Sequence, residues 1–364
     1  MTRITVSVQP QPYDALIESG LLQRAGALLR QSFPERKGCF IVTAAPVRRR
    51  WCGKLVDSLS QAGFEAKVLE MPDGEQHKRI RTLEHLAEKL VKFRADRSAL
   101  ILALGGGVVG DIAGFLASVY MRGVDVIQVP TTVLAQVDAS IGGKTGVNLK
   151  SGKNLVGTFH QPRAVLIDPQ VLSTLPEREF RSGLYEAIKC GVIGKPELFR
   201  RFEAKRDDIL RRNPAELEYL IAESVKLKAE VVSADERESG LRRVLNFGHT
   251  IGHALEADTN YRRYLHGEAV AWGMVAATNI AAEIGMLASP LASRIQETIC
   301  SLGPLPKVSS DYRQVARLLV SDKKTRDGKV HFILPRDIGQ VEVVEDVPNS
   351  VVINSIQALR AMSR

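Results

Sequence analysis

Three of the seven histidines of this 364-residue chain lie within eighteen residues of one another, and histidine is a common zinc ligand. His249 and His253 are four positions apart, so on a helix both imidazoles emerge from one face, and His266 follows. This spacing matches the zinc motif His-Glu-x-x-His, but Thr250 replaces the glutamate, so a metalloprotease would lack its general base. A catalytic zinc site of three ligands then needs a carboxylate from elsewhere, for which Glu186 is the candidate. Two histidines packed on an apolar helix are the alternative.

A second motif is rich in glycine. Gly105, Gly107 and Gly110 match the pattern G-x-G-x-x-G directly after an apolar run at 99–104. Such glycines let a pyrophosphate approach the backbone, and the helix that follows offers its free N–H groups. The motif predicts a dinucleotide or phosphate site, with a purely structural turn as the alternative. The acidic residue of a standard Rossmann site, expected about 20 positions later, is absent.

Residues 131–159 are polar and contain paired glycines, lysines and asparagines. Asp138 stands where a P-loop has its first glycine, which argues against a nucleoside triphosphate. We interpret the segment as a long working loop, and its lysines indicate an anionic ligand. A solvated loop without a function is the alternative.

Composition limits the class of protein. Hydrophobic residues make up 45% and charged residues 25% of the chain, and no apolar run approaches a membrane span, so no membrane partner is expected. The net charge is +9, but basic residues are dispersed and aromatic residues are only 5%, which favours a small anionic substrate over nucleic acid. No signal peptide is recognised and the four cysteines form no CxxC pair, so we expect a cytoplasmic protein.

The hydrophobic pattern changes once along the chain. Up to about residue 175, short aliphatic runs (39–43, 66–70, 99–104 and 124–129) alternate with amphipathic stretches (47–62, 78–93 and 107–119), as in βαβ units on a parallel sheet. From 176 the pattern is helical (176–190, 197–212, 214–235, 247–258, 266–287, 289–302 and 311–320), apart from strands at 330–334 and 340–344. The length favours two domains. We therefore predict an N-terminal Rossmann-like α/β nucleotide-binding domain at 1–175 and a C-terminal helical metal-binding domain at 176–364.

Several segments together resemble the 3-dehydroquinate synthase family in order and spacing. They are 105–111, 120–123, 130–145, 186–189, 246–253 and 266–270. The resemblance implies a shikimate-pathway lyase that converts 3-deoxy-D-arabino-heptulosonate 7-phosphate to 3-dehydroquinate and phosphate. It also implies catalytic NAD, a divalent metal (usually Zn²⁺, with Co²⁺ as a possible substitute) and a homodimer.

The resemblance also assigns residue roles. The metal ligands fall on Glu186, His249 and His266, and the catalytic residues are Lys144, Lys189, Glu238, Asn246 and His253. Substrate contacts fall on Arg122, Asp138, Lys144, Lys153, Asn154, Lys189, Lys228, Arg242, Asn246, His253 and Lys323 or Lys324. NAD contacts fall on Asp73, Gly74, Glu75, Gln76, His77, Lys78, Gly106, Gly107, Val108, Val109, Gly110, Asp111, Thr131, Thr132, Lys144, Lys153, Val171, Leu172, Ser173 and Thr174.

Two other enzyme classes share much of this pattern. A related sugar-phosphate cyclase would use the same metal and NAD residues, but Lys228, Arg242 and Asn246 weigh against a substrate without a carboxylate. An NAD- and metal-dependent polyol dehydrogenase has the same two-domain plan but would release NADH. The chain also departs from the family at 43–47, where an Asp and an Asn usually hold the adenosine ribose. The neighbouring arginines 48–50 would suit a 2′-phosphate, but a solvated helix face is the interpretation that we favour.

Overall fold

The computed structural model describes residues 1–321 and 330–363, and the chain divides into two compact units. The first unit comprises Met1–Pro176 and Leu217–Arg237, and the second comprises Glu177–Glu216 and Glu238–Arg364. The first unit therefore ends beside the predicted boundary, but it also includes Leu217–Arg237, which the sequence analysis assigns to the second domain. Hydrogen bonds explain this, because Ser233 bonds to the Ser7 backbone and Glu236 to the Gln161 side chain.

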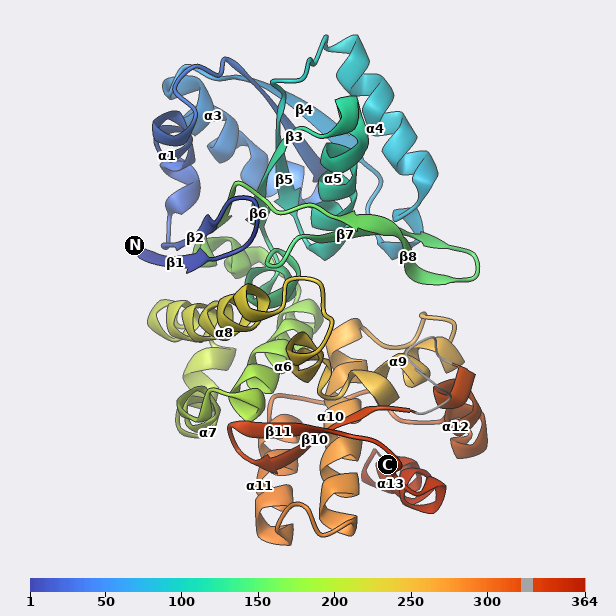
Figure 1. Cartoon of the computed structure of the whole chain (residues 1–364). Coiled ribbons are helices and arrows are strands. Elements are labelled where there is room, and N and C mark those ends of the chain that lie inside the picture. Colours follow the sequence, from blue (N-terminus) through green and yellow to red (C-terminus); the bar gives the residue numbers. More distant parts are fainter. Residues whose placement is uncertain (322–329, 364) are drawn as a thin grey trace. The chain divides into compact units, whose positions relative to one another are not determined.

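The first unit is built on a seven-stranded sheet with the order β1-β2-β9-β6-β5-β3-β4 (Figure 1). Only β1 and β2 are antiparallel to each other, and all other neighbours are parallel. The strands are β1 Thr2–Val6, β2 Tyr13–Ile17, β3 Gly38–Ala44, β4 Glu65–Met71, β5 Leu100–Gly105, β6 Asp125–Pro130 and β9 Ala164–Ile167. The four predicted parallel strands agree with β3, β4, β5 and β6 to within one residue at each end, which confirms the predicted α/β fold.

Helices cover both faces of this sheet (Figure 1). On one face, Val42 and Ile101 pack in a buried cluster with Leu86 and Ile112 of helices α4 and α5. The helices are α1 Ala25–Ser32, α2 Ala45–Val47, α3 Gly53–Gln61, α4 Ile80–Lys92 and α5 Gly107–Val119, with short turns η1 Leu21–Gln23, η2 Arg48–Cys52, η3 Glu75–His77, η4 Tyr120–Arg122, η5 Ala135–Ala139 and η6 Pro169–Thr174. Because side chains alternate along a strand, Ile41 faces the other side of the sheet, which α3 and α1 cover.

The predicted long loop at 131–159 is wrong. It contains the turn η5 and a hairpin of two antiparallel strands, β7 Lys144–Leu149 and β8 Gly152–Phe159, which packs against α5. Glycine at 146 and 157 permits the two backbones to approach, since a Cβ at either position would overlap the opposite strand. These glycines and the polar side chains conceal the alternation that normally reveals a strand.

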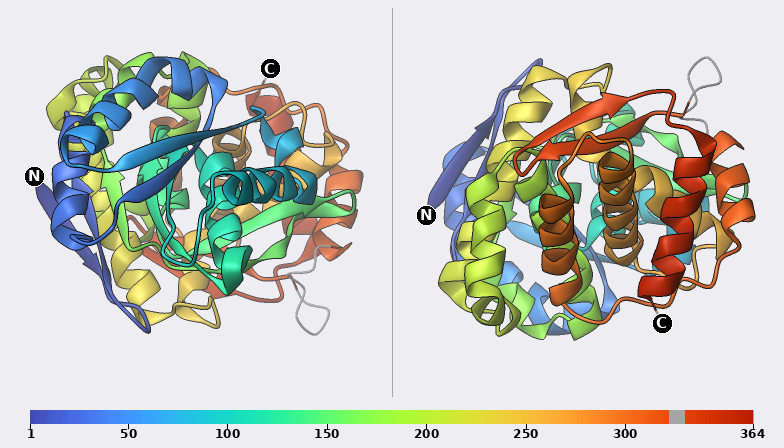
Figure 2. Two further views of the ribbon diagram at one scale, coloured as in Figure 1. Left: turned by 90° about the horizontal axis from the view of Figure 1, so that it is seen from above. Right: turned by 90° about the horizontal axis from the view of Figure 1, so that it is seen from below.

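The second unit is helical, as predicted. Its helices are α6 Glu177–Ile193, α7 Pro196–Leu210, α9 His249–Asp258, α10 His266–Glu283, α11 Ser289–Ser301, α12 Tyr312–Ser321 and α13 Asn349–Met362, with the turn η7 Leu241–Asn246. Helix α8, Pro214–Ala234, begins here and continues into the first unit. The antiparallel ribbon of β10 Phe332–Asp337 and β11 Gln340–Val344 packs beside α10 and α6 (Figure 2). None of the helices in the described part of the chain combines the length and apolar composition of a bilayer span.

Candidate active site

The second unit brings one carboxylate and three imidazoles together. Glu186 comes from α6, His249 and His253 from the first turns of α9, and His266 from the start of α10. Glu186 Oε1 lies 3.8 Å from His249 Nε2 and 3.6 Å from His266 Nε2. One ring nitrogen from each of the three histidines lies within 4.8 Å of the others. The three ring nitrogens therefore form one group that could hold a metal ion, and Glu186 Oε1 lies beside two of them.

The burial of Glu186 fits a cation beside it. The side chain is only 1% exposed, and neither oxygen has a hydrogen-bond partner in the described part of the chain. The ammonium of Lys189 forms an ion pair with Oε2 at 2.5 Å but leaves Oε1 to face the imidazoles. Lys189 compensates the charge at Oε2, but Oε1 remains a buried acceptor without a hydrogen-bond partner among the described residues, which a cation would satisfy. Imidazole nitrogens with one carboxylate oxygen form a donor set suited to Zn²⁺ or a similar divalent metal.

The outer ring nitrogens are also accounted for. His266 Nδ1 lies 3.3 Å from Glu256 Oε2, and His249 Nδ1 lies 3.2 Å from the Phe247 carbonyl oxygen. These acceptors take the Nδ1 protons, which leaves the Nε2 lone pairs facing Glu186. Glu256 was not among the residues predicted from the sequence. Its spacing of seven residues from His249, two helical turns, was the available signal.

Glycines allow the three helices to approach closely. A Cβ on Gly273 of α10 would overlap the carbonyl oxygen of Gly248, just before α9. A Cβ on Gly267 would overlap the carbonyl oxygen of Ser182 in α6. The separations between Glu186 and the histidines therefore depend on positions without side chains.

Other predicted residues of the second unit lie near α6. The turn η7, which packs against α6, carries Arg242 and Asn246. Asn246 Nδ2 donates to Glu238 Oε1 at 2.7 Å, so two predicted catalytic residues are in contact. Arg242 is 2% exposed, and its guanidinium is therefore largely shielded from water. Lys323 and Lys324 lie outside the described residues.

In the first unit, the glycine motif forms the turn between β5 and α5, as predicted. A side chain at position 110 would not fit, because a Cβ on Gly110 would lie 2.8 Å from Gln128 Oε1. Thr43 of the flanking strand β3 and Thr131, directly after the flanking strand β6, each have a buried hydroxyl oxygen without a hydrogen-bond partner among the described residues. Ligands of open α/β sheets bind at this carboxyl edge, so the arrangement fits a nucleotide cofactor.

The segment before α4 supplies further polar groups to this edge. Lys78, which is 4% exposed, forms an ion pair with Asp111 and donates to Asn154 Oδ1 at 2.5 Å. The structure thus joins two residues predicted to contact NAD with one predicted to contact substrate. Arg48 forms an ion pair with Glu70 at 2.6 Å, so at least one arginine of 48–50 has a partner other than a 2′-phosphate.

The remaining predicted residues of this unit lie on several different elements. Lys228 of α8 donates to the backbone and carboxylate oxygens of Asp138, each at 2.6 Å. Lys144 and Lys153 lie on the hairpin β7–β8, and Val171–Thr174 lie in η6, where Thr174 Oγ1 accepts from Trp51. Arg122 is exposed and lies just beyond the C-terminal end of α5. Gly107 and Asp111 lie in the first turns of this helix, at its other end. A 13-residue helix is roughly 20 Å long, so Arg122 is not brought to the glycine turn.

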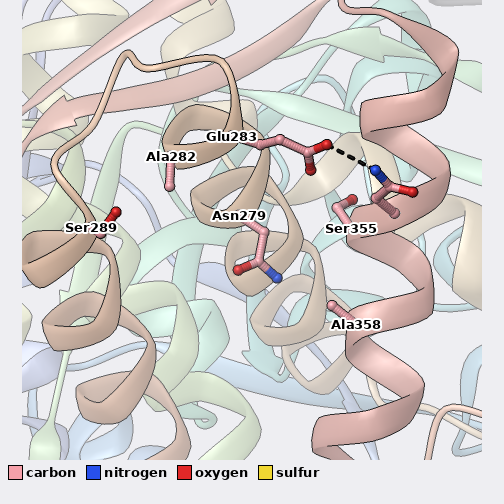
Figure 3. Close-up of a pocket in the computed structure, with 7 residues that line it drawn as sticks. Asn279, Ala282, Glu283, Ser289, Ser355 and Ala358 are labelled. Carbon is pink, nitrogen blue, oxygen red and sulfur yellow. Dashed lines mark hydrogen bonds between the residues drawn. The ribbon is translucent and has the colours of Figure 1, made fainter.

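A pocket of about 430 Å³ lies elsewhere in the second unit, between α10, α11 and α13 (Figure 3). Asn279, Glu283, Ser289 and Ser355 line it, and Glu283 accepts a hydrogen bond from Asn354. None of the predicted site residues is among its lining residues. The pocket therefore gives no support to the predicted chemistry.

Comparisons with known proteins identify the family of the chain. Residues 68–182 match the model of the 3-dehydroquinate synthase N-terminal domain, and residues 183–325 match that of the C-terminal domain. A 3-dehydroquinate synthase of Koribacter versatilis (strain Ellin345) is 56% identical over 363 residues, which cover 100% of this chain and 99% of the relative.

Two solved structures are similar over nearly the whole chain. One is 2-epi-5-epi-valiolone synthase of Streptomyces hygroscopicus subsp. jinggangensis 5008 with NAD⁺ and Zn²⁺ bound, at a TM-score of 0.89 and 29% identity, covering 98% of this chain and 99% of that one. The other is 2-deoxy-scyllo-inosose synthase complexed with carbaglucose-6-phosphate, NAD⁺ and Co²⁺, at a TM-score of 0.87, 26% identity and the same coverage. The two family models together span most of the chain, and the sequence identity to the Koribacter protein is about twice that to either cyclase. The chain belongs to the 3-dehydroquinate synthase family.

Proposed function

We propose that this chain converts 3-deoxy-D-arabino-heptulosonate 7-phosphate to 3-dehydroquinate and phosphate at a site built around Glu186, His249 and His266. Membership of the family makes the chain a phosphate-eliminating cyclase of the shikimate pathway. The observation that supports the site most strongly is the convergence of the Glu186 Oε1 and two Nε2 atoms at 3.6 and 3.8 Å around a carboxylate that is 1% exposed.

Zn²⁺ is the metal we propose for Glu186, His249 and His266, with Co²⁺ as a substitute, and NAD is the cofactor proposed for the β5–α5 turn. The two similar cyclases with bound NAD⁺ and either Zn²⁺ or Co²⁺ support this assignment. When bound, the metal supplies Lewis acidity at a substrate oxygen, and NAD supplies a hydride acceptor that later returns the hydride.

The residues of the chain bind and orient the anionic substrate. We assign its carboxylate and phosphate to cationic side chains, of which Arg242 and Lys228 are buried. Charge-assisted hydrogen bonds are strongest where water is excluded. Asp138 holds the Lys228 ammonium in place, and Glu238 does the same for the Asn246 amide.

His253 is the residue that we assign to proton exchange with substrate. Its ring centroid lies 5.2 Å from that of His249 and 5.8 Å from that of His266, so it belongs to the same cluster. Glu186 Oε1 lies close to the Nε2 atoms of the other two imidazoles, and imidazole is a common general acid or base near neutral pH.

Metal analysis tests the ligand assignment. Glu186→Ala, His249→Ala and His266→Ala should each lose bound metal and activity while circular dichroism stays unchanged, because two ligands hold zinc poorly. His253→Ala should retain the metal and lose activity. Full metal occupancy in any of the first three variants would contradict the assignment.

A comparison of substrates tests the proposed reaction. Faster turnover of sedoheptulose 7-phosphate than of the heptulosonate phosphate would indicate that the chain acts as one of the related cyclases.

We also propose a homodimer in which Arg122 acts on the site of the second copy. Two observations support this proposal. Arg122 is exposed and lies beyond the end of α5 that is remote from the glycine turn. Met121 and Arg122 also have positive φ angles, of 50° and 69°. Strained backbone of this kind is retained mainly where function requires it.

Mixing inactive variants tests this arrangement. If Arg122 serves the second copy, equal amounts of Arg122→Ala and His249→Ala should regain about a quarter of wild-type activity after subunit exchange, since half the dimers then hold one intact site. If Arg122 serves its own copy, the mixture stays inactive.

We also propose that the protein resides in the cytoplasm. Its four cysteines are all free, and Cys39, Cys52 and Cys190 are buried, as is usual where thiols stay reduced.

A further inference from the structure

Asn148 lies at the meeting point of two segments that carry different proposed roles. It stands near the end of β7 and is 5% exposed. Its Nδ2 donates to Glu75 Oε1 at 2.7 Å, and its Oδ1 accepts from the Asn154 backbone N–H at 2.9 Å. Glu75 belongs to the proposed cofactor segment and Asn154 to the proposed substrate segment. One side chain thus bridges the two.

The backbone of Asn148 strengthens the connection to the cofactor segment. Its N–H donates to the Lys78 carbonyl oxygen at 2.8 Å, and its carbonyl oxygen accepts from the Arg79 guanidinium at 3.1 Å. Lys78 in turn donates to the Asn154 side chain. The hydrogen bonds therefore form a closed circuit through Asn148, Lys78 and Asn154.

The hairpin is irregular at this position. Val147 pairs with Val156, but Leu149 pairs with Gly152. Residues 153–155 of β8 therefore lie opposite the single residue Asn148, where a regular antiparallel ladder would place one residue. Asn154, within this bulge, has a φ of 54°, in the left-handed region. The Asn148 amide accepts from the backbone N–H of this residue, and it therefore fixes the conformation that presents Lys153 and Asn154.

We propose that Asn148 is a positioning residue that couples the binding of the nucleotide cofactor to the binding of the anionic substrate. The inference rests on the proposed function of the two segments. The amide of Asn148 donates to Glu75 through its nitrogen and accepts from Asn154 through its oxygen, so one short side chain holds both segments. A ligand that fixes either segment then fixes the other through Asn148, so each ligand raises the affinity of the other by the same factor.

Calorimetric titration of metal-loaded enzyme with NAD⁺ measures this factor. The titration is repeated with a carbocyclic phosphonate analogue of the heptulosonate phosphate, which cannot lose phosphate. In the wild type the analogue should tighten NAD⁺ binding at least about fivefold. In Asn148→Ala the ratio of the two affinities should fall close to one.

Three further variants separate coupling from stability. Asn148→Asp keeps the size and the acceptor for Asn154 but sets a carboxylate against Glu75, so the ratio should fall. Combining it with Glu75→Gln reverses donor and acceptor and should restore the ratio, whatever the change in absolute affinity. Asn354→Ala removes a comparable bond, Asn354 to Glu283 at 2.8 Å, from the surface of the second unit and should leave the ratio unchanged.

Two outcomes overturn the inference: a wild type without coupling, or an Asn148→Ala variant that keeps the wild-type ratio. If Asn148→Ala does not fold, Asn148→Asp and its combination with Glu75→Gln decide the question, and a double variant that stays uncoupled contradicts it. A wild type that binds NAD⁺ but forms no 3-dehydroquinate refutes the proposed function, which is a distinct result.

Discussion

Glu256 provides the sharpest test at the scale of single residues. Its carboxylate lies 3.3 Å from His266 Nδ1, so it orients the ring and increases the electron density on Nε2. We predict that Glu256→Gln, which keeps the shape but removes the charge, weakens zinc binding roughly 10- to 100-fold. Competition with a chromophoric chelator measures the dissociation constant.

A matched control is available on the neighbouring helix. Glu283→Gln makes the same change at an exposed carboxylate of α10 and should leave zinc affinity at the wild-type value. Equal zinc affinities for Glu256→Gln and the wild type would show that Glu256 does not support the metal centre.

Arg242 carries the second residue-scale prediction. A guanidinium can hold an anion through two parallel hydrogen bonds, which an ammonium cannot copy, and at 2% exposure Arg242 is shielded from competing water. Arg242→Lys should therefore lower kcat/KM for the heptulosonate phosphate by about tenfold or more. Zinc content and melting temperature should stay close to the wild type. Unchanged kcat/KM would remove Arg242 from the substrate contacts.

The sequence alone was enough to identify the residues whose type indicates a metal site or a phosphate site. The histidine cluster stood out because histidines are few, and the glycine turn because glycines recur at fixed offsets. Neither Asn148 nor Glu256 was assigned a site role, because the importance of each comes from its hydrogen-bond partner: Glu75, 73 residues away, for Asn148, and His266, on another helix, for Glu256. Such contacts depend on the tertiary fold.

At the scale of elements, the spacing of α9 and α10 decides the separation of His249 and His266. Gly273→Ala would place a methyl group against the Gly248 carbonyl oxygen. Forcing the helices apart should destabilise the protein by about 1–3 kcal/mol and weaken zinc binding. Gly53→Ala is the control, because a Cβ there meets nothing within 4 Å and alanine favours a helix. Thermal melts that rank the two variants equally would contradict this explanation.

The elements that sequence predicted and those that it missed differ in their surroundings. Strands β3, β5 and β6 are buried on both faces and therefore appear as continuous apolar runs. The hairpin β7–β8 was taken for a loop because its strands are only partly buried and its backbone contacts require glycine. β9, with four residues, is too short for periodicity to identify.

At the scale of the whole molecule, burial should protect the thiols. Burial raises the pKa of the Cys39 thiol to about 12 and raises the pKa values of Cys52 and Cys300 as well. A raised pKa keeps a thiol protonated and therefore unreactive at about pH 8. We predict that Ellman's reagent modifies no more than one thiol of the native protein, the half-buried Cys300, and all four after denaturation. Rapid modification of several native thiols would contradict the predicted packing.

In the proposed reaction, one site oxidises and then reduces the same substrate carbon while phosphate leaves. The most direct measurement follows phosphate, 3-dehydroquinate and NADH absorbance together, with NAD⁺ equimolar to the metal-loaded enzyme and the heptulosonate phosphate in large excess. We predict equal amounts of phosphate and 3-dehydroquinate over many turnovers, without accumulation of NADH. NADH released in proportion to substrate consumed, or turnover that stops after one equivalent, would show that NAD is not recycled at the site and that the proposed reaction is wrong.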